Sequence, residues 1–240
     1  MSARIITLHV GEQGLRTLAN DAIQNDFMKG LVEIVTNSDD SYCKLERLGK
    51  TTSGKIDITL IRRTKTGRSL LRVRDLAEGM DSDRMEQVLG NYGSQTSGEG
   101  ARGVFGMGLK DTINAFGKGT IQSIRDGRLY RCTLELRERD QLEMFEPCVA
   151  SSRDREKLGI PVNGTVIDVL ISNRNVRIPL MSNLRRAVQS HVCLRKVISD
   201  PKRRVVVHEE GDVEDPVRYV MPKSTVLCEK KLVIPHFEGV

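Results

Sequence analysis

Three side chains between residues 31 and 44 have types and a spacing that suit proton transfer and metal binding. Glu33, Asn37 and Asp40 lie four and then three residues apart, so an α-helix would stack them on one face. The segment therefore predicts a helix that presents two carboxylates and an amide on one side. Taken alone, such a helix is more often a solvated polar face, but two further motifs change this interpretation. The opposite, apolar stripe is predicted to contain Phe27, Leu31, Ile34, Val35, Tyr42 and Leu45.

The first of these motifs places a carboxylate at the end of a buried strand. Residues 69–74 alternate so that Leu71, Val73 and Asp75 fall on the same side of a strand. A carboxylate that continues a core-facing row needs a hydrogen-bond donor, and the exocyclic amine of a ligand would serve. An ordinary Asp-containing turn that closes the strand is the alternative.

The second motif is rich in glycine and opens a predicted helix at residues 109–116. Gly103, Gly106 and Gly108 form a G-x-x-G-x-G pattern, which lets phosphate oxygens approach backbone N–H groups at the positive end of a helix. No βαβ unit surrounds the pattern, and the Gly-Lys-Ser/Thr ending of a Walker loop is missing. The preceding residues 90–103 are expected to form a mobile lid over a nucleotide.

Taken in order, these motifs resemble the GHKL superfamily of ATPases. That group contains DNA gyrase B, the heat-shock chaperone ATPases, sensor histidine kinases and MutL, with the type IIB topoisomerase (topoisomerase VI) B subunit and the MORC ATPases close by. Ala77 stands where the first glycine of the family's D-x-G-x-G box is usual. The matching residues are Glu33, Asn37 and Asp40 for E-x-x-x-N-x-x-D, Asp75 and Gly79 for D-x-G-x-G, Gly103, Gly106 and Gly108 for G-x-x-G-x-G, and Gly164 and Thr165 for a Gly-Thr pair ahead of a strand.

The resemblance implies that the chain binds ATP with Mg²⁺. Asn37 would supply a metal ligand, and Glu33 would take a proton from the water that attacks the γ-phosphorus. Asp75 would accept a hydrogen bond from the adenine amino group, helped by the Thr165 hydroxyl and a bridging water. Asp40 would order this face of the helix.

The resemblance also implies how the backbone approaches the nucleotide. Gly79 would let the chain come close to the base, and the three glycines of the G-x-x-G-x-G box would hold the phosphates. Lys110 is a further candidate for phosphate charge. The complete expected binding set is Asn37, Asp40, Asp75, Gly79, Met80, Gly103, Val104, Phe105, Gly106, Met107, Gly108, Lys110 and Thr165.

Composition limits the class of protein and its partners. The 240 residues are 38% hydrophobic and 29% charged, which describes a globular chain. No apolar run is long enough to span a bilayer and no secretory signal is evident, so a cytoplasmic location is expected, or a nuclear one in a eukaryote. Five cysteines are scattered singly, which argues against a disulfide framework or a zinc site.

The net charge of +6 makes nucleic acid a candidate partner. Aromatic residues form only 4% of the chain, so few side chains could stack on bases; a solvated strand face is the alternative. The basic residues cluster at Arg62, Arg63, Lys65, Arg68, Arg72 and Arg74, and at Arg195, Lys196, Lys202, Arg203 and Arg204.

Hairpins mixed with segregated helices predict an α+β, two-layer sandwich. This agrees with the Bergerat fold that the resemblance implies, a mixed, mostly antiparallel sheet with helices on one face forming the ATP pocket. Residues 1–200 should form that domain, and residues 201–240 should close it or begin a transducer-like segment. The expected strands are 5–10, 55–61, 69–75, 120–125, 128–136, 165–171, 204–208 and 224–234, and the expected helices are 31–44, 82–89, 109–116 and 180–198, with a loop or short helix at 14–25.

Three functions remain open from the sequence. The leading one is an ATP-gated dimerising clamp or switch that hydrolyses ATP slowly in isolation, because about 40 residues after the core cannot form a full transducer domain. A partner chain would then supply the trans-acting basic residue. The alternatives are a protein kinase of the same fold and a nucleotide sensor without turnover.

Overall fold

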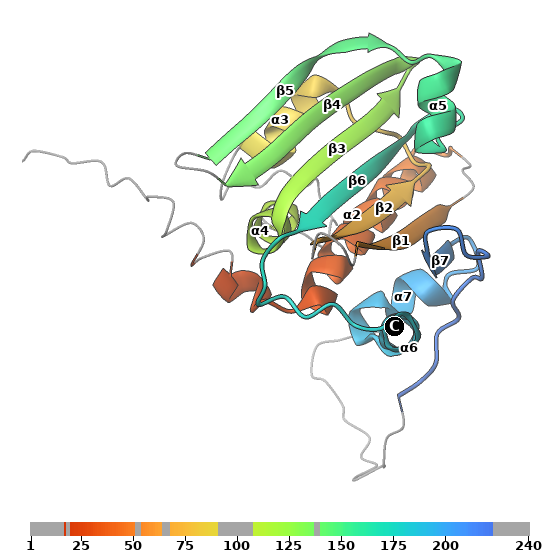
Figure 1. The fold of residues 1–240 in the computed structure, drawn as a ribbon. Coiled ribbons are helices and arrows are strands. Elements are labelled where there is room, and N and C mark those ends of the chain that lie inside the picture. The colour runs from red at the N-terminus through yellow and green to blue at the C-terminus, as the bar shows by residue number, and fades with distance from the viewer. Residues whose placement is uncertain are drawn as a thin grey trace, which may run out of the picture.

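A single seven-stranded sheet organises the described part of the chain (Figure 1). The computed structural model describes Thr17 and residues 20–50, 54–63, 68–90, 108–136 and 140–222. The strand order is β5-β4-β3-β6-β2-β1-β7, and every neighbouring pair is antiparallel except β1 and β7. The strands are β1 (Lys55–Arg63), β2 (Arg68–Asp75), β3 (Gly117–Arg125), β4 (Arg128–Leu136), β5 (Asp140–Val149), β6 (Gly164–Ile171) and β7 (Arg204–Glu209).

Helix α2 (Phe27–Arg47) packs on strands β1 and β2 of this sheet and on α4. It begins at Asp26, whose carboxylate accepts a hydrogen bond from the Met28 N–H at 2.8 Å and so satisfies a free donor of the first turn. All six residues of the predicted apolar stripe are buried. The helix is one turn longer at its N-terminus and three residues longer at its C-terminus than the motif predicted.

Five helices and a 3₁₀ turn share one main core with the sheet. In Figure 1, α2 and α3 lie behind the strands. The smaller α5 (Ser152–Leu158) belongs to a second core cluster with β3, β4 and β6. Because Val166 and Ile167 are both buried although they point to opposite faces of β6, that part of the sheet is covered on both sides. The helices on the main core are α2, α3 (Ser82–Gly90), α4 (Gly108–Phe116), α6 (Met181–Ser190) and α7 (Arg195–Ser199), with η1 at Val192–Leu194.

Most predicted elements are confirmed, and the α+β class with them. The Asp126-Gly127 turn joins β3 and β4, with φ of 49° and 79°, as a two-residue hairpin of this kind requires. The predicted single helix at 180–198 is wrong: it is broken at His191, whose extended backbone (ψ of 121°) ends α6 and starts the 3₁₀ turn.

Two elements were not predicted from the sequence. Strand β5 carries Pro147 and an acidic residue at every third position, Asp140, Glu143 and Glu146, a pattern that is weak for a strand. Helix α5 has a clearer signal, because Ser151 and Asp154 form a reciprocal capping box and Gly159 ends the helix in the left-handed conformation. With only seven residues, this helix is too short to show a recognisable helical period of apolar residues.

Some predictions fall on residues that the structure does not describe. These are the strands at 5–10 and 224–234, most of the lid at 90–103, and positions 103–107 of the glycine motif. Within the described ranges, β7 lies in the same sheet as β1, so residues 204–209 complete this sheet. No helix in those ranges is long and apolar enough to cross a membrane.

Candidate functional site

A cavity of about 500 Å³ lies where α2 and α3 meet the sheet. Six residues that the sequence predicted for a nucleotide site line it together: Asn37, Asp40, Asp75, Gly79, Met80 and Thr165. They come from α2, from the end of β2 with the loop that follows it, and from β6. The other lining residues are Ser38, Ser41, Lys44, Arg47, Glu78, Arg84, Gln87, Val88, Leu109 and Ile167.

The register of the sheet brings together Asp75 and Thr165, two polar residues that line the floor of the cavity. Asp75 pairs with Thr165 across β2 and β6, and Ser123 pairs with Thr165 across β3 and β6. The three side chains therefore form one row, and Ser123 Oγ lies 3.1 Å from Thr165 Oγ1. This explains how residues 90 positions apart in the sequence can line one cavity.

The Asp75 carboxylate is buried among neutral donors. It accepts hydrogen bonds from the Ala77 N–H at 3.0 Å and from Ser38 Oγ at 3.3 Å. Burial raises the pKa of Asp75 to about 6, although its hydrogen bonds from Ala77, Ser38 and Thr165 act in the opposite direction. Near neutral pH this group is a buried acceptor with no neutralising cation among the described residues, which is what an amine donor from a ligand requires.

The loop after Asp75 has a packing reason for its glycine. Gly79 has a φ of 76°, and a Cβ there would overlap the Ile124 carbonyl oxygen. Only glycine fits a position with both constraints. The next residue, Met80, donates its backbone N–H to Ser123 Oγ at 2.6 Å, and this bond fixes the loop to the floor of the cavity.

Ala77, which stands where the D-x-G-x-G motif has a glycine, is not among the residues that line this cavity. It is 2% exposed and lines a different cavity on the other side of its loop. Its backbone N–H still donates to Asp75. The Ala77 methyl group is therefore not part of the lining of the cavity that the predicted nucleotide residues share.

Glu33 lies one helical turn before Asn37, beside the N-terminus of α4. A Cβ at Gly108 would overlap the Glu33 carboxylate, so the glycine makes room for this side chain. Burial raises the pKa of Glu33. Burial also raises the pKa of the neighbouring Asp111 to about 6, and the charge of Glu33 contributes to that shift. A half-buried carboxylate with a raised pKa suits a general base.

Two other predicted site residues, Lys110 and Gly108, are not among the residues that line the cavity. Lys110 is fully buried in α4 and is not among the residues that line the cavity, so its phosphate contact stays a prediction. Gly108 begins α4, but its partners Gly103, Val104, Phe105, Gly106 and Met107 lie outside the described residues.

Basic residues at the cavity rim were missed by the sequence interpretation. Ser41, Lys44 and Arg47 continue the helical spacing of Asn37 along α2, and this periodicity could have identified them. Lys44 Nζ pairs with Glu78 at 2.6 Å. Arg84 and Gln87 come from α3, and no local signal in the sequence shows that α3 faces α2.

A second group of titratable residues forms a closed ion network instead of an open site. Asp57, His208 and Glu214 present ligand atoms within 4.8 Å of one another. Lys55 Nζ lies 2.7 Å from Glu214 and 3.4 Å from Asp57, and Arg74 also pairs with Asp57. Two cations therefore already neutralise the carboxylates that a metal ion would need.

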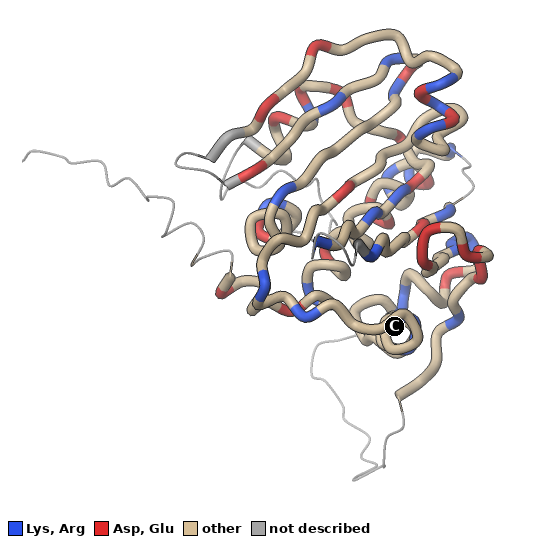
Figure 2. Tube along the Cα trace, in the orientation of Figure 1, with Lys and Arg blue, Asp and Glu red and all other residues tan. Residues whose placement is uncertain are grey.

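Several residues of the two basic clusters are engaged in similar pairs. Arg72 binds Asp168 through two hydrogen bonds of 2.7 and 2.8 Å. The Arg203 side chain is 1% exposed and pairs with Asp39 and Glu46, each at 2.6 Å. Figure 2 shows acidic and basic residues interspersed along the strands. These partners reduce the positive charge that the clusters offer to nucleic acid.

Neither a protein-family model nor a curated protein sequence significantly matches this chain.

Proposed function

We propose that this chain is a Mg²⁺-dependent ATPase module of the GHKL type with a Bergerat fold. The observation that supports this proposal is the meeting of Asn37, Asp40, Asp75, Gly79, Met80 and Thr165 in one cavity. Three segments far apart in the sequence contribute to it. Their residue types supply an acceptor for an exocyclic amine, a hydroxyl beside it, and an amide oxygen at the mouth.

The adenine base would bind against the floor of the cavity. Asp75 accepts from the exocyclic amine, and Thr165 assists through its hydroxyl. Because Asp75 is buried, a carbonyl in place of the amine would leave the acceptor facing another acceptor. The site therefore favours adenine over guanine.

The phosphates would lie toward the N-terminus of α4, whose backbone N–H groups and dipole favour negative charge. The oxygen donors on α2 fit Mg²⁺, which prefers such ligands, and Asn37 would hold it. When bound, Mg²⁺ neutralises charge on the phosphate oxygens. Glu33, one turn before Asn37, takes a proton from the attacking water.

We further propose that the module acts as an ATP-gated switch that dimerises or meets a partner chain. Lys44, Arg47 and Arg84 line the cavity, but Lys44 is already paired with Glu78. A basic residue from a second chain would complete the γ-phosphate site, so we expect slow turnover in isolation. Sedimentation with and without a non-hydrolysable ATP analogue tests dimerisation.

Calorimetric titration with ATP and GTP, beside a phosphate-release assay, tests the nucleotide site. Glu33→Ala should keep ATP binding and lose turnover by about 100-fold or more. Asp75→Ala should abolish ATP binding, and Asn37→Ala should weaken it. Asp83→Ala, which removes an exposed carboxylate of α3, is the matched control.

Each outcome decides between the candidate functions. Equal ATP and GTP affinities would reject the adenine site, and equal turnover in Glu33→Ala and the unmodified chain would reject the assigned base. Radiolabel that moves from ATP to protein instead of water would identify a kinase. ATP binding with neither release nor transfer would identify a sensor.

A further inference from the structure

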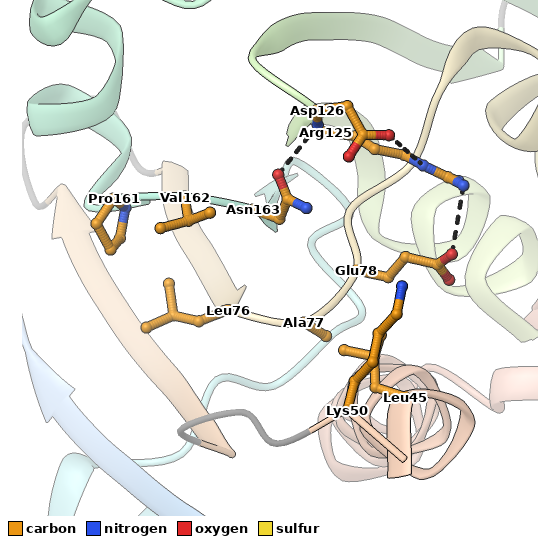
Figure 3. Close-up of a pocket in the computed structure, with 10 residues that line it drawn as sticks. All are labelled: Leu45, Lys50, Leu76, Ala77, Glu78, Arg125, Asp126, Pro161, Val162 and Asn163. Atoms are coloured by element: carbon orange, nitrogen blue, oxygen red, sulfur yellow. Dashed lines mark hydrogen bonds and ion pairs between the residues drawn. The ribbon is translucent and has the colours of Figure 1, made fainter. Parts of the chain in front are cut away.

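A second cavity of about 420 Å³ lies on the other side of the loop that carries Asp75 and Gly79 (Figure 3). Leu76, Ala77 and Glu78 form the part of the wall nearest to the candidate nucleotide site, and Glu78 lines both cavities. Its size is within the range of small-molecule sites. The proposed ATPase chemistry uses none of its residues.

One part of this second cavity is apolar and accessible. Leu45 ends the apolar stripe of α2, and Leu76 packs beside the smaller core cluster. Pro161 and Val162 face them from the segment before β6 (Figure 3). The Val162 side chain is 69% exposed, so an apolar ligand that covers this wall would remove hydrophobic surface from water.

The two carboxylates of the cavity are already paired. Arg125 lies 3.3 Å from Glu78 and 3.7 Å from Asp126. The Asp126 backbone N–H donates to Asn163 Oδ1 at 3.0 Å, which ties the β3–β4 turn to the segment before β6. These contacts, drawn as dashed lines in Figure 3, fix one side of the cavity before any ligand arrives.

Lys50 is the lining cation without an ion-pair partner among the described residues. Its backbone N–H donates to the Leu45 carbonyl at 2.9 Å, and the Gly49 N–H donates to Glu46 at 2.9 Å. With Gly49 at a φ of 70°, these bonds form the helix-ending motif that holds Lys50 beside Leu45. Within the described residues, the Lys50 ammonium group forms no ion pair. Two cations and two carboxylates line the cavity, and both carboxylates lie beside Arg125, so the Lys50 ammonium group next to the apolar wall is open to an anion.

We propose that this second cavity binds a small amphipathic carboxylate, with its head group on Lys50 and its apolar body against Leu45, Leu76 and Val162. An uncharged molecule of the same shape would gain only the apolar contact. A short carboxylate would gain only the ion pair. The site should therefore require both parts of the ligand.

Octanoate is a suitable probe, with octanol and butyrate as matched controls for its two parts. The full chain, labelled at its methyl groups, is titrated with each compound and followed by NMR. Octanoate should shift the methyl signals of Leu45, Leu76, Ala77 and Val162. The methyl groups of Val192, which is equally exposed but distant in the fold, report any non-specific binding.

Variants of Lys50 test the head-group contact without disturbing the hydrophobic core, because this side chain is exposed. Lys50→Ala should weaken octanoate about threefold to fivefold, the range expected for an exposed ion pair. Lys50→Glu should weaken it further and leave octanol unchanged. Lys196→Ala removes an exposed lysine elsewhere and should change nothing.

The proposal is overturned if octanoate leaves the cavity methyl signals unshifted, or if octanol binds as tightly as octanoate. Octanoate binding that is equal in Lys50→Glu and the unmodified chain would overturn it as well. None of these results bears on ATP binding, because the probe and the readout are confined to the second cavity.

Discussion

Two buried aspartates on neighbouring strands of this sheet have opposite electrostatic surroundings. Asp57 on β1 is 2% exposed and accepts from Arg74, His208 Nε2 at 2.8 Å and Thr59. Asp75 on β2 is 5% exposed, and its described side-chain hydrogen bonds come from neutral donors, the Ser38 hydroxyl and the Ala77 N–H. The two aspartates therefore differ in their hydrogen-bond and ion-pair partners and not in their burial.

The partners move the two pKa values in opposite directions. Burial alone would raise the pKa of Asp57, but the His208 hydrogen bond and the charges of Arg74 and Lys55 hold it below its ordinary value. Burial raises the pKa of Asp75 to about 6, and no cation among the described residues offsets it. A carboxylate that the fold neutralises is structural, whereas one left without a cation is available to a ligand.

Removing the charge of Asp57 should have the largest effect on stability. Asp57→Asn leaves Arg74 and His208 beside a neutral amide, and breaking a buried ion network of this kind costs about 3 kcal/mol of unfolding free energy. Chemical denaturation measures it. Asp168→Asn is the matched control, because the Arg72–Asp168 pair is more exposed and should cost about 1 kcal/mol or less. Equal losses of unfolding free energy in Asp57→Asn and Asp168→Asn would contradict the expected difference between the buried network and the exposed pair.

The same substitution, aspartate to asparagine, at Asp75 should change the free energy of unfolding in the opposite direction. The raised pKa means that folded Asp75 binds more protons than unfolded Asp75 between about pH 4 and pH 6, so its contribution to stability falls as the pH rises through that window. Asp75→Asn should therefore stabilise the ligand-free protein by up to about 3 kcal/mol at pH 7, with the difference vanishing near pH 4. It should also weaken ATP at least about tenfold. A destabilised Asp75→Asn protein at pH 7 would contradict this account.

Nucleotide affinity should depend on pH through Asp75. Its ionised form accepts from an amine, so ATP affinity should fall about tenfold between pH 7 and pH 5, as the group gains a proton with a pKa of about 6. Calorimetry across this range measures the loss. Asp75→Asn serves as the control, because titration of the ATP phosphates affects both proteins and only the unmodified chain has the additional dependence.

The smallest effect should follow the loss of one neutral donor. Ser38→Ala removes the hydroxyl that lies 3.3 Å from Asp75 Oδ2, which should raise the pKa of Asp75 further and weaken ATP by about 1 kcal/mol at pH 7. The midpoint of the pH profile should move upward. Ser190→Ala, on the distant helix α6, should leave the profile unchanged; an unchanged profile in Ser38→Ala would show that this donor is immaterial.

Local patterns in the sequence predicted much of the fold and part of the site. The spacing of Glu33, Asn37 and Asp40 specified a helix, and the apolar row ending at Asp75 specified a strand with its carboxylate inward. Asp126-Gly127 specified the hairpin turn. These predictions rest on periodicity and turn chemistry, which act over a few residues.

What the sequence could not supply depends on contacts between distant segments. The pairing of Asp75 with Thr165 and Ser123 follows from the register of three strands. The facing of α3 and α2, the break at His191 and the closed network around Asp57 also depend on long-range packing. The sequence by itself determined which residues carry the polar chemistry. Only the tertiary structure decided that, among the described residues, cations surround Asp57 and none pairs with Asp75, because a buried carboxylate acquires its cations from whichever strands the fold places beside it.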